Sequence, residues 1–122
     1  MTDVIEGEVE GTNGNIVVPQ QVLDVIQSAP SGIDILTVCI DTAVWLAHKN
    51  ISYGDSALNP LRVFSKADTV EQIKVRIDDK LNRLMNGQEY IGDDDAKDLL
   101  GYLVLYFVAL GRESDVHGTD AE

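Results

Sequence analysis

The sequence has few of the residues that build the most familiar kinds of site. It contains 1 cysteine, Cys39, so no disulfide can form within the chain, which is typical of a reducing compartment. This cysteine and the 2 histidines form no zinc-binding pattern. His48 and His117 do not suit a Ser-His-Asp triad, and a glycine-rich phosphate loop is absent from the sequence. These absences exclude a disulfide scaffold, a zinc domain and a P-loop enzyme.

Long apolar runs are missing as well. The longest spans residues 99–110, whereas a transmembrane helix needs about 20 apolar residues, so we interpret this run as a core helix. The first residues lack the basic and apolar regions of a secretion signal. We therefore expect no membrane association and a cytoplasmic location.

Basic residues are scarce, because 9 lysines and arginines stand against 21 aspartates and glutamates and give a net charge of −12. Such a surface repels phosphate backbones, so general binding of DNA or RNA is not expected. A single nucleotide held through a divalent cation is compatible with this charge. Most of the acidic residues serve solubility.

What the sequence does contain is helical periodicity, which predicts an all-α fold, a small helical bundle. Four helices are expected, at residues 19–28, 33–49, 69–86 and 94–110. Asp68 and Thr69 are good N-caps for the third helix, and Asn86-Gly87 and Gly111 are expected to end the third and fourth helices.

The helices occupy one predicted domain, residues 16–111, between flexible acidic tails at 1–15 and 112–122. Residues 15–18 predict at most a short edge strand. The connection at 50–68 is long for a small domain, so we expect an ordered loop with a functional role.

Apolar side chains at helical spacing predict the buried faces. The second helix is expected to bury Leu36, Cys39, Ile40, Ala43 and Ala47, and the third to bury Val70, Ile73, Ile77, Leu81 and Leu84. The fourth helix is apolar nearly all round, more than a small bundle covers within one chain. A homo-oligomer, a dimer or higher, is therefore expected.

Two carboxylates one turn apart, Asp95 and Asp98, open the fourth helix. Carboxylates at this spacing can share Mg²⁺, a hard cation that prefers oxygen ligands. Alternatively they serve the helix dipole, which favours acidic residues in a first turn. The dipole explains Asp98 less well, because this residue lies deeper, beside the apolar run.

A second group of polar residues shares one face of the third helix: Gln72, Arg76, Asp79 and Arg83. Arginine forks bind phosphate oxygens in pairs, and Asp79 would add a metal ligand. A salt-bridged face in solvent explains the same spacing. The sequence leaves both interpretations open.

The long connection and its flanks supply further candidates: Lys49, Asn50, Tyr53, Asp55, Asn59 and Arg62. The tyrosine could stack on a base, the asparagines could read its edge, and the cations could meet phosphate. An ordinary ordered loop with turn residues accounts for them equally well.

Four motifs resemble the nucleotide-modification-associated domain 1 family, which is common in bacteriophages and prophages. They are KNISYGDSA at 49–57, NPLRVFSK at 59–66, VRIDDKLNR at 75–83 and DAKDLLGY at 95–102. The resemblance covers roughly residues 35 to 110. It implies a nucleotide-related role in the cytoplasm of an infected or lysogenic bacterial host.

A weaker similarity is to the all-α nucleoside triphosphate pyrophosphatases of the MazG and dimeric dUTPase kind, which hold Mg²⁺ on two carboxylate pairs. Asp95-x-x-Asp98 looks like their second pair, with Asp in place of Glu. The first pair is not matched, since Arg76-x-x-Asp79 stands in its place. This departure argues against multi-metal pyrophosphohydrolysis and leaves one-metal nucleotide binding.

The leading hypothesis is a phage-type protein that binds or metabolises a nucleotide with Mg²⁺. Asp79, Asp95 and Asp98 would hold the cation, with Asp79 and Asp98 catalytic. In an enzyme, a metal-polarised water would attack a phosphoanhydride of a (deoxy)nucleoside phosphate. The substrate-binding set is Lys49, Asn50, Tyr53, Asp55, Asn59, Arg62, Arg76, Lys80, Arg83 and Tyr102.

Two alternatives come from other classes. One is a non-catalytic protein that sequesters a nucleotide or serves a nucleotide-modification system as an accessory subunit, with no need for metal. The other is a structural protein whose helices dimerise. Asp98→Asn would abolish turnover in the enzyme only.

Overall fold

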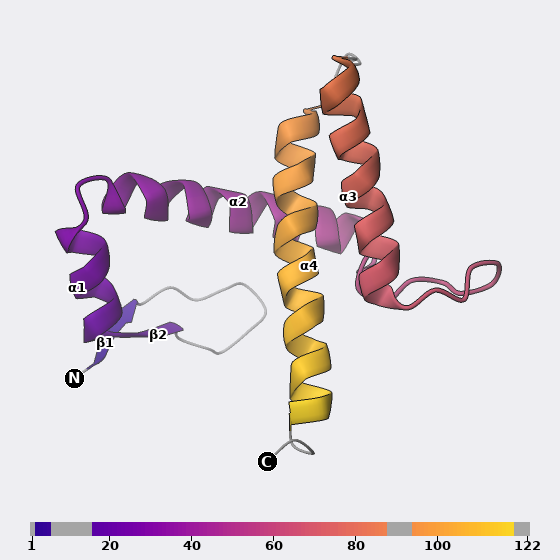
Figure 1. Cartoon of the computed structure of the whole chain (residues 1–122). Helices are drawn as coiled ribbons and strands as arrows, with labels where there is room; N and C mark the ends of the chain where they lie inside the picture. The colour runs from indigo at the N-terminus through magenta and orange to yellow at the C-terminus, as the bar shows by residue number, and fades with distance from the viewer. Residues whose placement is uncertain (1, 6–15, 88–93, 119–122) are drawn as a thin grey trace. The chain divides into compact units, whose positions relative to one another are not determined.

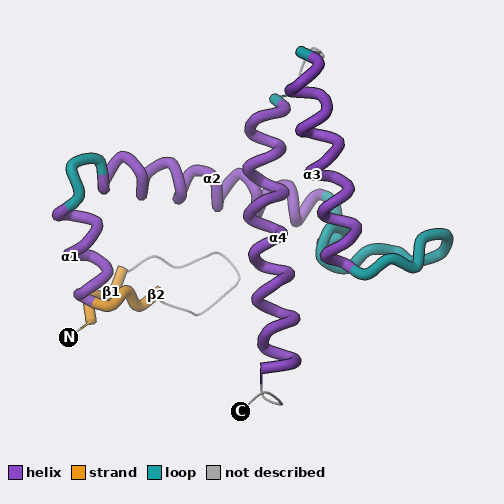
Figure 2. The backbone as a smooth tube through the Cα atoms, in the orientation of Figure 1, coloured by secondary structure: helices purple, strands orange, loops and turns teal. Residues whose placement is uncertain are grey.

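The computed structural model describes residues 2–5, 16–87 and 94–118 (Figure 1). Its elements are β1 (Thr2–Ile5), β2 (Ile16–Pro19), α1 (Gln20–Ser28), α2 (Gly32–Ser52), α3 (Thr69–Asn86) and α4 (Asp95–Gly118). Helices dominate this part of the chain, as Figure 2 shows, so the predicted all-α class is confirmed.

Residue contacts divide the chain into two compact units, Met1–Val44 and Trp45–Glu122, here called the N-terminal and C-terminal units. The boundary falls inside α2. The sequence instead predicts one domain over residues 16–111. Periodicity alone does not show where contacts become sparse along a continuous helix.

In the N-terminal unit, β1 pairs antiparallel with β2, from Thr2 opposite Pro19 to Ile5 opposite Ile16. The short strand expected at 15–18 is therefore confirmed, and residues 2–5 of the expected tail form its partner. The rest of that tail, 6–15, lies outside the described residues. The turn from α1 to α2 requires glycine at Gly32, because an added Cβ would lie 1.7 Å from the Ile26 carbonyl oxygen.

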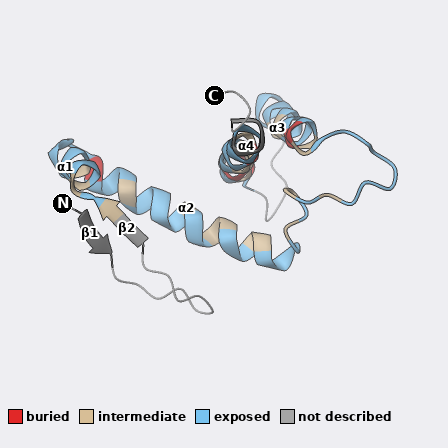
Figure 3. Cartoon of the chain, turned by 90° about the horizontal axis from the view of Figure 1, so that it is seen from below, coloured by how far each residue is buried: buried red, intermediate tan, exposed pale blue. Residues whose placement is uncertain are grey.

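The prediction that one face of α2 is buried is wrong for the single chain. Most of α2 is exposed, with some half-buried stretches (Figure 3). Gly32 is the one buried residue of α2, and Cys39, Ile40, Ala43 and Ala47 are exposed. Leu36 is half-buried. The helical spacing identifies an apolar side correctly, but burial also requires an element that packs on it.

In the C-terminal unit, α3 and α4 lie side by side (Figure 1). Val70, Ile73 and Ala109 form the buried core, and half-buried Leu58, Ile77, Leu105, Tyr106 and Leu110 pack against it. Leu58 comes from the loop after α2, so part of that connection is anchored in the core. Leu81 and Leu84 were expected to be buried but are exposed, since they lie beyond the stretch of α3 that carries this core.

The helix ends follow local chemistry in most places. The Asp68 carboxylate accepts a hydrogen bond from the Glu71 N–H at 2.8 Å, and Gly87 closes α3 in the left-handed region at φ 64°. Asp94 caps α4 through the Lys97 N–H at 3.0 Å. The predicted stop at Gly111 is wrong, because α4 continues to Gly118. One glycine costs a helix only about 1 kcal/mol relative to alanine.

The outer face of α4 carries exposed apolar side chains, among them Leu100, Val104 and Phe107. Self-association through this face stays a prediction. Among the described residues, no single helix has the length and apolar character to cross a membrane. The consecutive helices α1 and α2 meet those criteria only as a pair bent by 117°.

Candidate functional pocket

A pocket of about 380 Å³ lies within the C-terminal unit. Its wall combines the last two turns of α2, the turn that follows them, the first two-thirds of α3 and the first half of α4. Seven residues of the predicted site line it: Lys49, Asn50, Tyr53, Arg76, Lys80, Asp98 and Tyr102. The structure thus brings together candidates that are up to 53 positions apart in the chain.

Six other predicted site residues do not line this pocket: Asp55, Asn59, Arg62, Asp79, Arg83 and Asp95. Sequence reasoning also missed Trp45, which lines the pocket and is the 1 tryptophan of the chain. The sequence feature that could have identified Trp45 as a site residue is its position one helical turn before Lys49. The ammonium groups of Lys49 and Lys97 lie 4.7 and 4.6 Å from the centroid of its ring.

Positive charge is concentrated in this pocket. Lys49, Arg76 and Lys80 line it, and Asp98 is the one acidic residue of its wall. Lys49 and Lys80 form ion pairs within the chain. Arg76 makes no hydrogen bond or ion pair with any residue in the described part of the chain. Its guanidinium is the cation best placed to meet an anion from outside.

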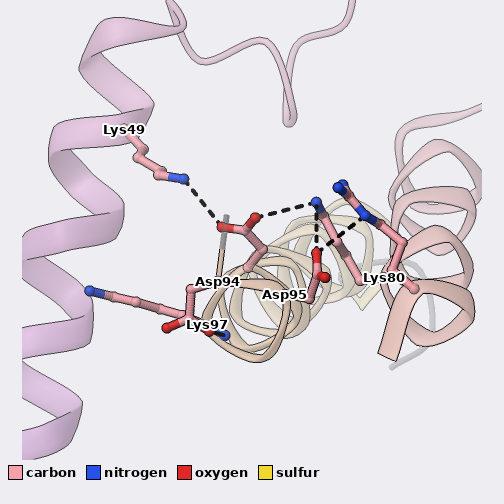
Figure 4. A network of polar contacts seen from close by, with 7 residues as sticks. Lys49, Lys80, Asp94, Asp95 and Lys97 are labelled. Carbon is pink, nitrogen blue, oxygen red and sulfur yellow. Dashed lines mark hydrogen bonds and ion pairs between the residues drawn. The ribbon is translucent and has the colours of Figure 1, made fainter. Parts of the chain in front are cut away.

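A chain of ion pairs joins α2, α3 and α4 at the pocket wall (Figure 4). Asp98 Oδ1 lies 3.3 Å from Lys49 Nζ, and Asp98 Oδ2 lies 3.3 Å from Lys80 Nζ. Lys80 Nζ is also 3.8 Å from Asp95 Oδ1, which is 3.4 Å from Arg83 Nε. Lys80 therefore bridges the two carboxylates that open α4.

Asp95 is only 2% exposed, and neither of its carboxylate oxygens has a hydrogen-bond partner in the described structure. Lys80 Nζ, at 3.8 Å from Asp95 Oδ1, lies beyond hydrogen-bond distance, and Arg83 Nε, at 3.4 Å, makes no hydrogen bond with it. The attraction is therefore mainly Coulombic. A charge this deeply buried requires such cations beside it.

Two of the three carboxylates predicted to hold Mg²⁺, Asp95 and Asp98, thus face side-chain cations. Asp79 is exposed on α3, and the described residues include no group of three His, Cys, Asp or Glu side chains placed to hold a metal ion. Geometry does not assemble Asp79, Asp95 and Asp98 into one set of ligands. A metal brought by a bound nucleotide stays a prediction.

The loop candidates form a turn of their own. Asp55 adopts the left-handed region at φ 61°, where it accepts a hydrogen bond from Asn50 Nδ2 at 2.7 Å and a second from Asn59 Nδ2. Arg62 donates to the Thr69 hydroxyl at 3.0 Å and lines a separate pocket of about 280 Å³. The two amides predicted to read a base therefore serve the turn.

The same hydrogen bonds change the acidity of Asp55. Donation from Asn50 lowers the pKa of this carboxyl below its ordinary 3.8; partial burial opposes the shift, and Asn59 and Arg112 add to it. Ionised Asp55 thus stabilises the fold above pH 3.8, and this contribution is lost as the pH falls through the lowered pKa.

We expect Asp55→Asn to lower the thermal midpoint at neutral pH, while the difference from the original chain shrinks in acid. Asparagine tolerates the left-handed backbone, so the change tests the charge. The measurement is thermal unfolding of both proteins from neutral pH to about pH 2. Asp78→Asn, at an exposed position of α3, is the control. A difference independent of pH would contradict the assignment.

No protein-family model, curated protein or solved structure matches this chain. Membership of the nucleotide-modification-associated family therefore stays a prediction. The chemistry of the pocket itself is what indicates a function.

Proposed function

We propose that this chain binds a nucleotide, or a phosphate-bearing small molecule of similar size, in the pocket between α2, α3 and α4. One observation carries the proposal. Three of the nine basic residues of a chain with net charge −12 line a single pocket, against one carboxylate. A concave site with a few convergent polar groups is the usual form of a ligand site, and about 380 Å³ is within the usual range of size.

Arg76 is the expected anchor of the phosphate. Its planar guanidinium can hold two phosphate oxygens at once, and no described side chain occupies it. Lys49, across the pocket, is 40% exposed and can add a point charge. The acidic remainder of the surface disfavours polymers, so the ligand is a free nucleotide.

The aromatic side chains that line the pocket are suited to contact the base or the sugar. Tyr102 is half-buried in the first half of α4, and Tyr53 is exposed just after the end of α2. Either can offer an aromatic face to a base, and base stacking contributes about 1–3 kcal/mol where it has been tested by substitution. Trp45 already contacts two lysine ammonium groups, so its role is to position these cations.

Binding without turnover is the function that this geometry favours. Asp95 and Asp98 form ion pairs with Lys80, Arg83 and Lys49, which supports a role for these carboxylates in holding the cations in place. Hydrolysis is a second candidate, because Asp98 lies on the pocket wall, where a Mg²⁺ ion carried by the nucleotide could meet it. The two functions differ in whether product forms.

The test uses the single tryptophan as the reporter, since Trp45 lines the pocket. Its fluorescence is followed while the full chain is titrated with each nucleoside and deoxynucleoside triphosphate and with inorganic pyrophosphate, with Mg²⁺ or with EDTA. Calorimetry confirms each hit, and released phosphate is analysed. Saturable binding in EDTA without product supports the binder. Product that requires Mg²⁺ supports the hydrolase.

We expect Arg76→Gln to weaken the binding of pyrophosphate by about tenfold to a hundredfold, since it removes a charge-assisted contact of roughly 1.5–3 kcal/mol. Lys74→Gln removes the same charge from α3, but Lys74 pairs with Glu71 and does not line the pocket. This control is expected to bind as the original chain does. Equal weakening in both variants would refute a specific site at Arg76.

A further inference from the structure

One feature of the pocket opposes the binding of an anion. Asp98 lies among its cations and places one carboxylate oxygen 3.3 Å from Lys49 and the other 3.3 Å from Lys80. All three side chains line the pocket. The positions that a phosphate would take beside these lysines are therefore held by a negative charge of the chain itself.

The two lysines differ in how readily they can leave Asp98. The side chain of Lys80 is 15% exposed and also faces buried Asp95, so it is fixed from both sides. The side chain of Lys49 is 40% exposed, and its ammonium has a second favourable contact with the Trp45 ring, whose centroid is 4.7 Å away. Lys49 is the cation that a ligand can recruit, while the pair of Lys80 with Asp98 persists.

We propose that Asp98 is a built-in competitor that sets how much negative charge a ligand needs. The inference rests on the proposed function and specifies its ligand class. A terminal phosphate carries about −1.5 to −2 charges and three oxygens at neutral pH, so it outcompetes a single carboxylate. A phosphodiester carries a single negative charge, so replacing the Asp98 carboxylate beside the lysines with a phosphodiester gives no gain in charge. The pocket therefore selects nucleotides with a terminal phosphate or polyphosphate over cyclic nucleotides and diesters.

The test compares the original chain with Asp98→Asn, using pyrophosphate, a nucleoside triphosphate and the 3′,5′-cyclic monophosphate of the same base, all in EDTA. We expect the variant to bind pyrophosphate about tenfold more tightly, because a repelling charge is removed from the site. The cyclic nucleotide is expected to become a measurable ligand. Affinities come from calorimetry and from Trp45 fluorescence.

Asp78→Asn changes the net charge equally at an exposed position outside the pocket and is expected to leave each affinity unchanged. Circular dichroism checks folding, and Asp98→Ser repeats the test if the asparagine variant does not fold. If the original chain binds phosphate through Arg76 and the Asp98 variants bind it no more tightly, this inference alone falls. If the original chain binds no phosphate, the proposed function falls with it.

Discussion

Replacing Asp95 by alanine is expected to lower the free energy of unfolding by about 3–5 kcal/mol, the largest effect of any single carboxylate in the described structure. Asp95 is 2% exposed, and its carboxylate lies beside Lys80 and Arg83. Without it, the ammonium of Lys80, only 15% exposed, keeps Asp98 alone as its counter-ion. Urea unfolding followed by circular dichroism measures the change.

Two further variants separate the buried charge from general damage. Asp78→Ala removes an exposed aspartate from α3 and is expected to change stability by less than about 0.5 kcal/mol. Lys80→Met in the Asp95→Ala background removes the largely buried ammonium that has lost one of its two counter-ions, and it is expected to recover part of the loss. If Asp95→Ala costs less than about 1 kcal/mol, the ion pairs contribute little and Asp95 is a dispensable helix-dipole residue.

The sequence predicts helix ends well where the signal is local. Asp68 and Gly87 act on backbone groups three residues away, so their caps form whatever else packs nearby. Gly111 shows the limit of this reasoning. Its open surroundings add no penalty beyond its own flexibility, and the helix continues through it.

The burial of a side chain, and the residues that it contacts, are harder to predict because both depend on elements that are distant in the sequence. The apolar side of α2 is visible in the sequence, but whether Ile40 or Ala43 is buried depends on what packs there, and they are exposed in this chain. The candidate site shows the same division. Spacing groups Arg76 with Asp79, but in the structure Arg76 lines the pocket and Asp79 does not.

The carboxylates of α4 illustrate what sequence leaves open even when the residues are chosen correctly. The sequence leaves Asp95 and Asp98 as ligands of Mg²⁺ or as helix-dipole residues, and in the structure side-chain cations lie beside both. Their source, lysine and arginine side chains of α2 and α3, depends on tertiary packing. Nothing in the spacing of Asp95-x-x-Asp98 distinguishes a metal site from a site that orients lysines.

The second large effect is expected at Gly101, where α4 lies against Trp45 and Leu46 at the end of α2. A Cβ added there would lie 3.0 Å from Trp45 and 3.3 Å from Leu46, and the same glycine lines the pocket. Gly101→Leu is therefore expected to lower the free energy of unfolding by about 1–3 kcal/mol through overpacking. It should also abolish nucleotide binding, because the new side chain displaces Trp45 and fills the pocket.

Gly111→Leu is the matched control, since it makes the same substitution on the same helix where no atom lies within 4 Å of an added Cβ. Leucine is the better helix former, so this variant is expected to gain about 0.5–1 kcal/mol of stability. Urea unfolding and the pyrophosphate titration report both quantities for each variant. A loss of stability in Gly101→Leu together with a gain in Gly111→Leu would assign the loss to the contact between residue 101 and Trp45. Equal effects at both positions would mean that α4 does not pack against Trp45 in solution, and the pocket would then lack the wall on which nucleotide binding depends.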